Sequence, residues 1–239
     1  MPHASLPDSR PSSTPSLTTP EQLRPLRVQR LGVVPYAAAL ELQQQLVARR
    51  RRDEVPDHLL LLEHSHVITM GTSARREHVL ADEAQRRLLG LQLFETGRGG
   101  DVTYHGPGQL VGYPVIDLKP DRCDLHRYLR DLEQVLIQTL AAFGIDAVRK
   151  PGLTGVWMDN AKIAAIGVRV SSGWISSHGF ALNVDPDLRF FTAIVPCGIH
   201  DHGVTSMRQV LGCAPDGDAV AAQVVNSFSA VFNRAPTFA

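Results

Sequence analysis

The sequence is short of the features that mark secreted, membrane-spanning and nucleic-acid-binding proteins. Three cysteines in 239 residues argue against a disulfide framework and for a reducing compartment, so we expect a cytoplasmic protein. The 24 Lys and Arg residues are balanced by 24 Asp and Glu, which leaves no positive excess for binding a nucleic-acid backbone. No apolar run approaches the roughly 20 residues that a membrane-spanning helix needs. Neither nucleic acid nor a membrane is therefore an expected partner.

The N-terminal stretch has a different composition from the rest of the chain. Residues 1–25 are rich in Pro, Ser and Thr and lack the apolar core of a secretory signal, while Asp8 and Glu21 argue against a transit peptide. Such a segment has too little apolar surface to offset the entropy of ordering it. We expect residues 1–26 to form a disordered extension and residues 27–239 to form a single domain.

Apolar periodicity predicts three helices and six strands. Helical spacing extends over Tyr36–Arg51, Asp124–Phe143 and Asp218–Phe232, whereas strand-like runs cover Val28–Val34, His58–Glu63, Leu91–Thr96, Gly155–Met158, Ile163–Val170 and Trp174–Val184. Short loops separate the last three strands, which predicts an antiparallel meander. The four arginines at 49–52 are expected to be a solvated helix end. The predicted fold class is α/β (α+β), with much antiparallel sheet.

A glycine-rich stretch at residues 97–109 contains five glycines in thirteen residues. Glycine lets a backbone approach a ligand closely and expose its N–H groups. The stretch is not a phosphate loop, because no Gly-Lys-Ser/Thr ends it, and it lacks the dinucleotide-binding spacing. The alternative is a tight irregular turn without a ligand.

Lys162 opens a predicted strand. Side-chain alternation would place it on the face of Ala164, Ile166 and Val168, where an ammonium group needs a compensating partner. Alternatively, Lys162 still belongs to the preceding turn and extends into water.

Cys197 lies between Pro196 and Gly198 in a predicted loop, where access and backbone freedom suit a nucleophile. Cys123 and Cys213 have no comparable neighbourhood and are predicted to be structural. Two alternatives remain for the same region. His200 and His202 could join Cys197 at a zinc site, with His64 and His66 as further ligands, although the spacing fits no common zinc pattern. A histidine such as His105 or His178 could instead act as the base of a Cys–His dyad.

Several ordered motifs carry a family resemblance. They are Arg98–Gly100, Thr103–Gln109, Lys162–Ala164 with Ile166-Gly167, Ser177–Asn183, Pro196–Ile199 and Gly203–Ser206. Together they closely resemble the lipoyl(octanoyl) transferases, the acyltransferases of lipoate biosynthesis. The resemblance implies the fold of the biotin and lipoate protein ligases, a single catalytic domain with a mixed, largely antiparallel sheet flanked by helices.

The resemblance also implies a reaction and its partners. Octanoyl would pass from octanoyl-acyl-carrier protein to Cys197 as a thioester, with Lys162 as the second catalytic residue. It would then pass to a lysine of apo lipoyl domains, in E2 subunits of 2-oxoacid dehydrogenases and in the glycine cleavage H protein, as the first step of endogenous protein lipoylation. No cofactor and no metal would be needed, and the protein would be a monomer.

By motif, the resemblance assigns fourteen substrate-binding residues. They are Arg98, Gly99, Gly100, Asp101, Val102, Thr103, Tyr104, His105, Ala165, Ile166, Gly167, Gly179, Phe180 and Ala181. Apolar Val102, Ile166 and Phe180 suit the wall of an acyl tunnel. Two positions depart from the family pattern: Asp101 occupies a slot expected to be tolerant, and the family more often has proline near His66.

The residue types fit this chemistry independently of the family. A free thiol with a pKa near 8.5 is only about 3% thiolate at neutral pH. An ammonium about 4 Å away would favour the thiolate by up to ~4 kcal/mol. Two other functions stay open from the sequence: an ATP-dependent lipoate-protein ligase on the same fold, which would not need Cys197, and a non-catalytic binder of lipoyl domains.

Overall fold

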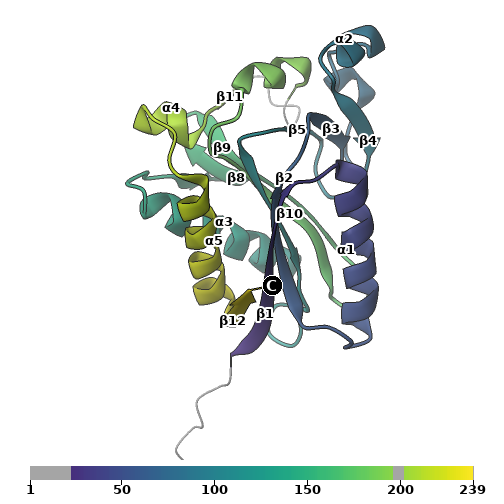
Figure 1. The fold of residues 1–239 in the computed structure, drawn as a ribbon, viewed down its shortest axis with the longest axis vertical. Helices are drawn as coiled ribbons and strands as arrows, with labels where there is room; N and C mark the ends of the chain where they lie inside the picture. The colour runs from purple at the N-terminus through teal and green to yellow at the C-terminus, as the bar shows by residue number, and fades with distance from the viewer. Residues whose placement is uncertain (1–22, 196–201, 239) are drawn as a thin grey trace, which may run out of the picture.

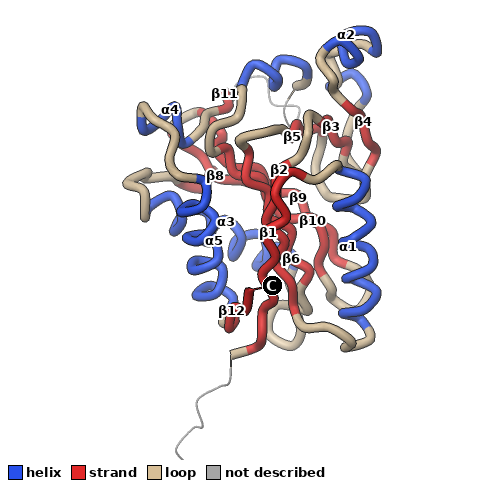
Figure 2. Tube along the Cα trace, viewed as in Figure 1, coloured by secondary structure: helices blue, strands red, loops and turns tan. Residues whose placement is uncertain are grey.

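The computed structural model describes residues 23–195 and 202–238, so Cys197 and His200 lie outside the described residues. Within them, nine strands form the main sheet and three form a smaller one (Figures 1 and 2). The main-sheet strands are β1 (Arg24–Val33), β2 (Asp57–Glu63), β6 (Gln109–Val115), β7 (Val148–Lys150), β8 (Leu153–Met158), β9 (Ala161–Val170), β10 (Ser176–Asn183), β11 (Gly203–Val204) and β12 (Arg234–Phe238). The smaller sheet contains β3 (Val67–Met70), β4 (Gln92–Glu95) and β5 (Val102–His105). The helices are α1 (Tyr36–Arg51), α2 (Glu83–Leu88), α3 (Leu125–Ala141), α4 (Met207–Leu211) and α5 (Gly217–Phe232), with 3₁₀ turns η1 (Arg76–His78) and η2 (Leu188–Ala193).

The main sheet is mixed and largely antiparallel, as expected. Its order is β12-β1-β2-β6-β10-β9-β8-β7, and β11 pairs with β9 off this path. Only the pairings of β1 with β12, β1 with β2 and β11 with β9 are parallel. The predicted meander is present as β8, β9 and β10.

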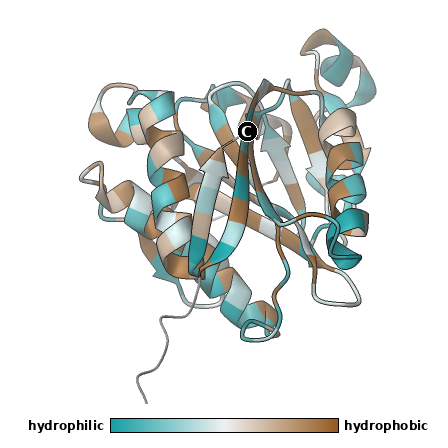
Figure 3. Ribbon diagram, turned by 60° about the horizontal axis from the view of Figure 1, so that its bottom comes forward, coloured by the Kyte–Doolittle hydropathy of each residue, from teal (hydrophilic) through white to brown (hydrophobic). Residues whose placement is uncertain are grey.

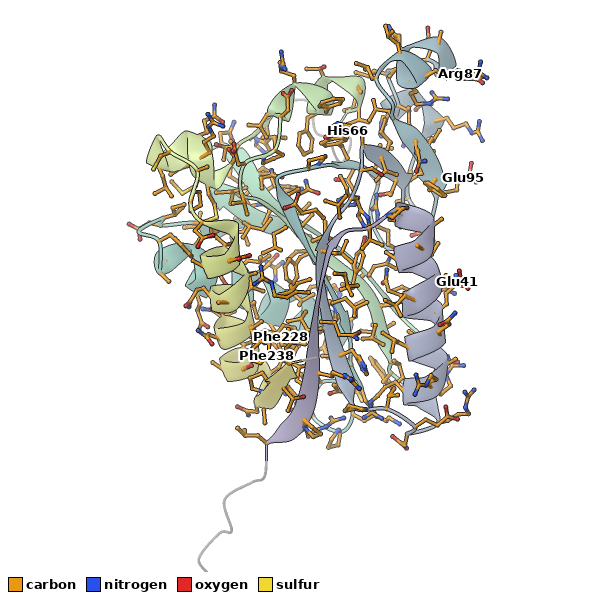
Figure 4. The ribbon with its side chains drawn as sticks, viewed as in Figure 1. Glu41, His66, Arg87, Glu95, Phe228 and Phe238 are labelled. Atoms are coloured by element: carbon orange, nitrogen blue, oxygen red, sulfur yellow. The ribbon has the colours of Figure 1, made fainter. Side chains whose placement is uncertain are left out.

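Helices cover both faces of the main sheet, with α1 on one side and α3 and α5 on the other (Figure 1). The sequence of β2 shows why both faces are buried. Leu59 and Leu61 join the cluster under α3 and α5, whereas Leu60 and Leu62 join the cluster under α1. An uninterrupted apolar run is typical of a strand covered on both faces. Figure 3 shows hydrophobic residues along the central strands and hydrophilic ones on outward parts of the helices, and Glu41 projects from α1 away from the sheet in Figure 4.

The three predicted helices are confirmed, with small shifts at their ends. The carboxylate of Asp124 accepts hydrogen bonds from the backbone N–H groups of His126 and Arg127, at 2.8 and 3.2 Å, and so caps α3. Asp216 caps α5 in the same way, two residues before the predicted start. The strands β3, β5, β6, β7, β11 and β12 and the short helices α2 and α4 were not predicted. Most are too short for periodicity to distinguish them from loops.

The arginine run at 49–52 is not uniformly solvated, which corrects the expectation. Arg50 is buried and donates to Asp57 at 2.8 Å, and Asp57 also accepts from the buried Arg234 at 2.8 Å. Asp117 lies 3.6 Å from Arg50. Asp57 also lies 3.7 Å from Arg24 of β1, so this ion-pair network connects the end of α1 to the first and the last strand, β1 and β12. Composition cannot reveal such a long-range relationship.

The boundary expected at residue 27 is also corrected. β1 begins at Arg24, and Leu26 is fully buried in the core. Arg24 donates to the carbonyls of Asp117 and Lys119 at 3.1 and 2.7 Å. The ordered domain therefore begins before Arg27, while residues 1–22 lie outside the described part. No helix within that part is both long and apolar enough to cross a membrane.

Candidate functional site

A cavity of about 640 Å³ lies between the smaller sheet and one end of the main sheet. This volume is within the usual range for small-molecule sites. Twelve of the fourteen predicted substrate-binding residues line it, as does Lys162. The twelve are Arg98, Gly100, Asp101, Val102, Thr103, His105, Ala165, Ile166, Gly167, Gly179, Phe180 and Ala181. Segments distant in the sequence therefore meet around one cavity.

Two of the predicted residues do not line the cavity. Tyr104 is fully buried on the other side of β5, where its ring stacks on Phe190 with centroids 5.4 Å apart and its hydroxyl lies 2.8 Å from Nδ1 of His66. Gly99 donates its N–H to the carbonyl of Val168 at 2.8 Å, and so joins the glycine loop to β9. Strand alternation separates Tyr104 from its neighbours Thr103 and His105.

The glycine-rich loop is held by its own arginine and by the segment after β3. Arg98 is buried and donates to the carbonyl of Thr69 at 2.6 Å and to its hydroxyl at 3.0 and 3.1 Å. The N–H groups of Thr72 and Ser73 donate to the carbonyls of Arg98 and Gly100 at 2.9 and 3.1 Å. Gly100 has a φ of +88°, a conformation in which a side chain would be strained. The loop is therefore a built part of the cavity wall and not an irregular turn.

The apolar wall comes from facing strands. Phe180 of β10 pairs with Ile166 of β9 on one side and with Gly112 of β6 on the other. Val102 of β5 is fully buried, and Phe180 is nearly so. All three residues line the same cavity, the arrangement expected for a site that accepts an acyl chain.

Aromatic hydroxyl groups line another part of the wall. The carbonyl of Val34 accepts from Nδ1 of His64 at 2.7 Å, so Nε2 of His64 accepts from the hydroxyl of Tyr113 at 2.8 Å. Burial raises the pKa of Tyr113 well above its ordinary value and that of Tyr36 as well, so both hydroxyls remain protonated. Tyr36 begins α1, and nothing in its local sequence marks it as a wall residue.

The two histidines considered as bases are buried and neutral. Burial, with a smaller effect from His64, lowers the pKa of His105 to about 3. Burial also lowers the pKa of His178 to about 4, helped by the charges of Arg98 and Arg169. Groups with such pKa values are poor proton acceptors near neutral pH. This weakens the Cys–His dyad alternative.

Lys162 lies in β9 but not on the face that simple alternation predicted. Val156 of β8 pairs with Ala164, and the next residue, Trp157, pairs with Lys162, so β9 has one extra residue at this point. The bulge leaves Ile163 and Ala164 in the core and places Lys162 and Ala165 along the cavity. The prediction that Lys162 shares a face with Ala164 is therefore wrong, because of this bulge.

The surroundings of Lys162 position its side chain. Its Nζ lies 4.8 Å from the centroid of the Trp157 ring, a cation–π contact. Gly155, at φ +118°, lies against the same strand: a Cβ there would lie only 2.7 Å from the carbonyl oxygen of Ala164, whereas Cε of Lys162 would be at an ordinary contact distance of 3.4 Å. Val204 of β11 pairs with Lys162, and the N–H of Thr205 donates to the carbonyl of Lys162 at 3.0 Å.

The described residues on either side of positions 196–201 are Val195 and His202, and each has a contact near the cavity. The N–H of Val195 donates to the carbonyl of His78 at 2.8 Å, and His78 lines the cavity. On the other side, His202 packs edge-on against Trp157, with ring centroids 5.2 Å apart. The described residues on either side of positions 196–201 therefore contact one residue that lines the cavity, His78, and one that packs against Lys162, Trp157.

Asp101 has more contacts than a tolerant position would need. Its carboxylate lies 2.5 Å from Nδ1 of His78 and accepts from the N–H groups of Val102 and Arg75 at 2.7 and 3.3 Å. These contacts connect the glycine loop to η1.

Sequence reasoning did not predict the following wall residues: Tyr36, Ser73, Arg75, His78, Tyr113, Gly152, Leu153, Thr154 and His178. Of these, only His178 stood within a motif that the sequence had singled out.

The zinc alternative receives no support from the part of the chain that the structure describes. No group of three His, Cys, Asp or Glu side chains that could hold a metal is found among those residues. His64 and His66 are instead engaged by Tyr113 and Tyr104. Cys197 and His200 lie outside the described residues, so the expectation of a metal-free site stays a prediction. Cys123 and Cys213 are exposed and do not line the cavity.

Comparisons with known proteins support both the fold and the activity. Residues 35–229 match the family Lipoyl protein ligase A/B catalytic domain. The chain is 53% identical over 213 residues to an octanoyltransferase of Rubrobacter xylanophilus, covering 88% of this chain and 96% of that one. It is 50% identical over 206 residues to an octanoyltransferase of Solibacter usitatus, with 86% and 92% covered.

Solved structures show the same fold. The chain superimposes on a bi-partite lipoate protein ligase of Thermoplasma acidophilum with a TM-score of 0.71 at 18% identity, covering 90% of this chain and 88% of that one. The expected fold of the lipoate protein ligases is confirmed. At about half identity over most of its length, with the family's catalytic domain, the chain belongs to the octanoyltransferase family and is an acyltransferase.

Proposed function

We propose that this octanoyltransferase works through a Cys197 thioester and delivers octanoyl to a lysine of an apo lipoyl domain. In the first step the Cys197 thiolate attacks the thioester carbonyl of octanoyl-acyl-carrier protein. A new C–S bond forms, the donor's C–S bond breaks, and the departing thiolate takes a proton from Lys162. In the second step the lysine amine attacks the acyl-enzyme, a C–N bond forms, and the Cys197 thiolate leaves. The acceptor lysine arrives as an ammonium group, so it passes one proton to neutral Lys162 before it attacks and releases a second proton to solvent as the amide forms.

The observation that carries the proposal is that the described chain on each side of the Cys197 segment is bonded to a residue that lines the cavity. Val204 pairs with Lys162, and Val195 is bonded to the cavity residue His78. Cys197 therefore belongs to a short segment whose described neighbours are bonded on one side to His78 and on the other to Lys162, and both of these residues line the cavity. An ammonium group near a thiol favours the thiolate, which is the reactive form.

The apolar residues that line the cavity favour an acyl chain as substrate. Val102, Ile166 and Phe180 offer apolar surface, and removing an acyl chain from water is favourable by about 0.8 kcal/mol for each buried CH₂ group. A thioester donor and a thioester intermediate are close in energy, so the first transfer needs no nucleotide. The likeness to lipoate protein ligases at 18% identity concerns the fold and does not favour ATP-dependent chemistry.

Intact-protein mass spectrometry after incubation with octanoyl-acyl-carrier protein tests the proposal. We expect a hydroxylamine-sensitive octanoyl adduct on the wild-type protein and none on Cys197→Ser. Cys123→Ser and Cys213→Ser are matched controls, because both thiols are exposed and lie outside the cavity. Addition of apo lipoyl domain should remove the adduct and octanoylate the acceptor.

Two results would contradict the proposal. One is an adduct that survives Cys197→Ser and maps to another cysteine. The other is lipoylation from free lipoate and ATP by the Cys197→Ser variant, which would favour the ligase alternative. A protein that binds the lipoyl domain but forms no adduct and transfers nothing would be the non-catalytic binder.

A further inference from the structure

We propose that a buried hydrogen-bond chain fixes His105 as the Nδ1–H tautomer, so that its Nε2 accepts a hydrogen bond from the attacking lysine amine. His105 is then a hydrogen-bond acceptor for the second half-reaction and not its base. The inference rests on the proposed function, because it assigns a role in the amine-transfer step of the same site.

The hydrogen-bond chain begins at a tight turn between β5 and β6. His105 ends β5 and Gln109 begins β6, and the N–H of Gln109 donates to the carbonyl of Gly106 at 3.2 Å. The turn requires glycine at 106, because a Cβ there would lie 1.9 Å from the hydroxyl oxygen of Tyr104. It brings Nδ1 of His105 to 2.6 Å from Oε1 of Gln109.

Two backbone carbonyls determine the orientation of the side-chain amides of Asn183 and Gln109. Asn183 lies opposite Gln109 in the pairing of β10 with β6. Its Nδ2 donates to the carbonyl of Thr205 at 2.9 Å, so its Oδ1 accepts from Nε2 of Gln109, at 2.9 Å. Nε2 of Gln109 also points at the carbonyl of Tyr104, 3.4 Å away. Carbonyl oxygens accept and never donate, so neither amide can be reversed without placing two acceptors face to face.

The tautomer of His105 follows from these orientations. Oε1 of Gln109 can only accept, so Nδ1 of His105 carries the hydrogen. The ring is neutral near neutral pH because burial lowers its pKa to about 3. Nε2 therefore has a lone pair, and no partner for it is found among residues 23–195 and 202–238. His105 lines the cavity, so this lone pair is the part of the ring left for a ligand.

The hydrogen-bond chain ends at the backbone of Lys162. Thr205, whose carbonyl holds Asn183, donates its own N–H to the carbonyl of Lys162 at 3.0 Å. Gln109 and Asn183 line a second, smaller cavity together with Lys162 and Trp157. The hydrogen bonds that orient His105 therefore extend to Lys162 in β9.

The chemistry identifies the group that His105 receives. An octanoyl thioester has a carbonyl acceptor and apolar carbons, and neither can donate to Nε2. A lysine amine carries N–H donors, and its nitrogen lone pair must face the acyl carbon. A hydrogen bond from one N–H to Nε2 would hold the amine in this orientation once Lys162 has taken a proton from the arriving ammonium group.

Two substitutions separate this role from a structural one. His105→Gln places an amide oxygen near the position of Nε2, whereas His105→Asn keeps a donor toward Gln109 and loses the acceptor in the cavity. Single-turnover rates of self-acylation and of transfer to the lysine would be measured for both variants. We expect His105→Asn to lower transfer about tenfold more than self-acylation, the size expected for one hydrogen bond in the transition state. His105→Gln should restore most of that loss, and the exposed His126→Gln is the control.

Nitrogen-15 NMR of the imidazole provides a readout that does not depend on activity. We expect the Nδ1–H tautomer from pH 5.5 to 8 in the wild-type protein, and a mixture of tautomers in Gln109→Met. An Nε2–H tautomer or an imidazolium at neutral pH would overturn the inference. So would equal losses of both half-reactions in His105→Asn. Failure of the proposed function itself would appear differently, as the absence of any adduct on the wild-type protein.

Discussion

The ring of Phe180 occupies the space that a side chain on Gly112 would need. The two residues face each other across β10 and β6, and a Cβ on Gly112 would lie 2.1 Å from Cζ of Phe180. Gly179 is also packed against Gly112: a Cβ on Gly179 would lie 2.1 Å from the carbonyl oxygen of Gly112. Glycine at 112 and at 179 therefore allows a large aromatic ring to form part of the cavity wall.

We expect Gly112→Ala to push the Phe180 ring toward the cavity and shorten the space for the acyl chain. Overpacking of this kind costs about 1–3 kcal/mol. Self-acylation from octanoyl-acyl-carrier protein should therefore fall about tenfold or more, while a butyryl donor should be affected much less. Gly217→Ala is the control, because nothing lies within 4 Å of a Cβ at that position. Equal losses for both donors would show that the effect is on folding and not on chain length.

The two roles proposed for Lys162 can be separated by its replacements. Lys162→Arg keeps a positive charge but does not readily lose a proton, because the guanidinium pKa exceeds ~12. Self-acylation should partly survive in this variant, while transfer to the acceptor lysine collapses, since an amine with a pKa near 10.4 arrives protonated. Single-turnover measurement of each step would check this. Near-normal rates of both steps in Lys162→Ala would remove Lys162 from the mechanism.

The N-terminal boundary gives a sharp test of where the domain begins. A chain starting at Leu23 should keep its stability and its acyl-transfer rate within a few-fold of the full-length protein. A chain starting at Arg27 loses the fully buried Leu26 and the bonds of Arg24, and loss of a buried leucine side chain typically costs about 2–5 kcal/mol. Urea denaturation of both chains would measure the difference. Equal unfolding free energies of the two chains would support a domain boundary at residue 27.

Stability should depend on pH through His178. Its pKa is lowered from about 6.5 in an unfolded chain to about 4 in the folded protein. The unfolded chain therefore binds the proton first, so this contribution is complete above pH 6.5 and is lost as the pH falls toward 4. The expected slope is about 1.4 kcal/mol per pH unit for this group.

His178→Asn removes the titrating group and suits the position, because φ is +56° and asparagine tolerates that region. The variant should show a shallower decline of unfolding free energy between pH 6 and 4, measured by urea titration at each pH. A slope identical to that of the wild type would mean that His178 does not titrate in this way.

The sequence by itself determined the main helices, the antiparallel meander and the segments that meet at the site. Apolar periodicity and capping residues are local signals, so α1, α3 and α5 could be located from neighbours in the chain. The glycine-rich loop and the Lys162 region were also recognisable, because their residue types conflict with an ordinary core or turn. The short strands β3 and β5 were not, since their four residues each are stabilised by partners far away in the sequence.

Only the tertiary structure decided how these segments face one another. The bulge opposite Val156 and Trp157 reversed the predicted face of Lys162, and alternation in β5 turned Tyr104 away from the cavity. Tyr113 and His78 became wall residues through strand pairing and loop contacts that no local pattern encodes. The physical reason is that side-chain direction in a sheet depends on register, and register is set by pairing between distant strands.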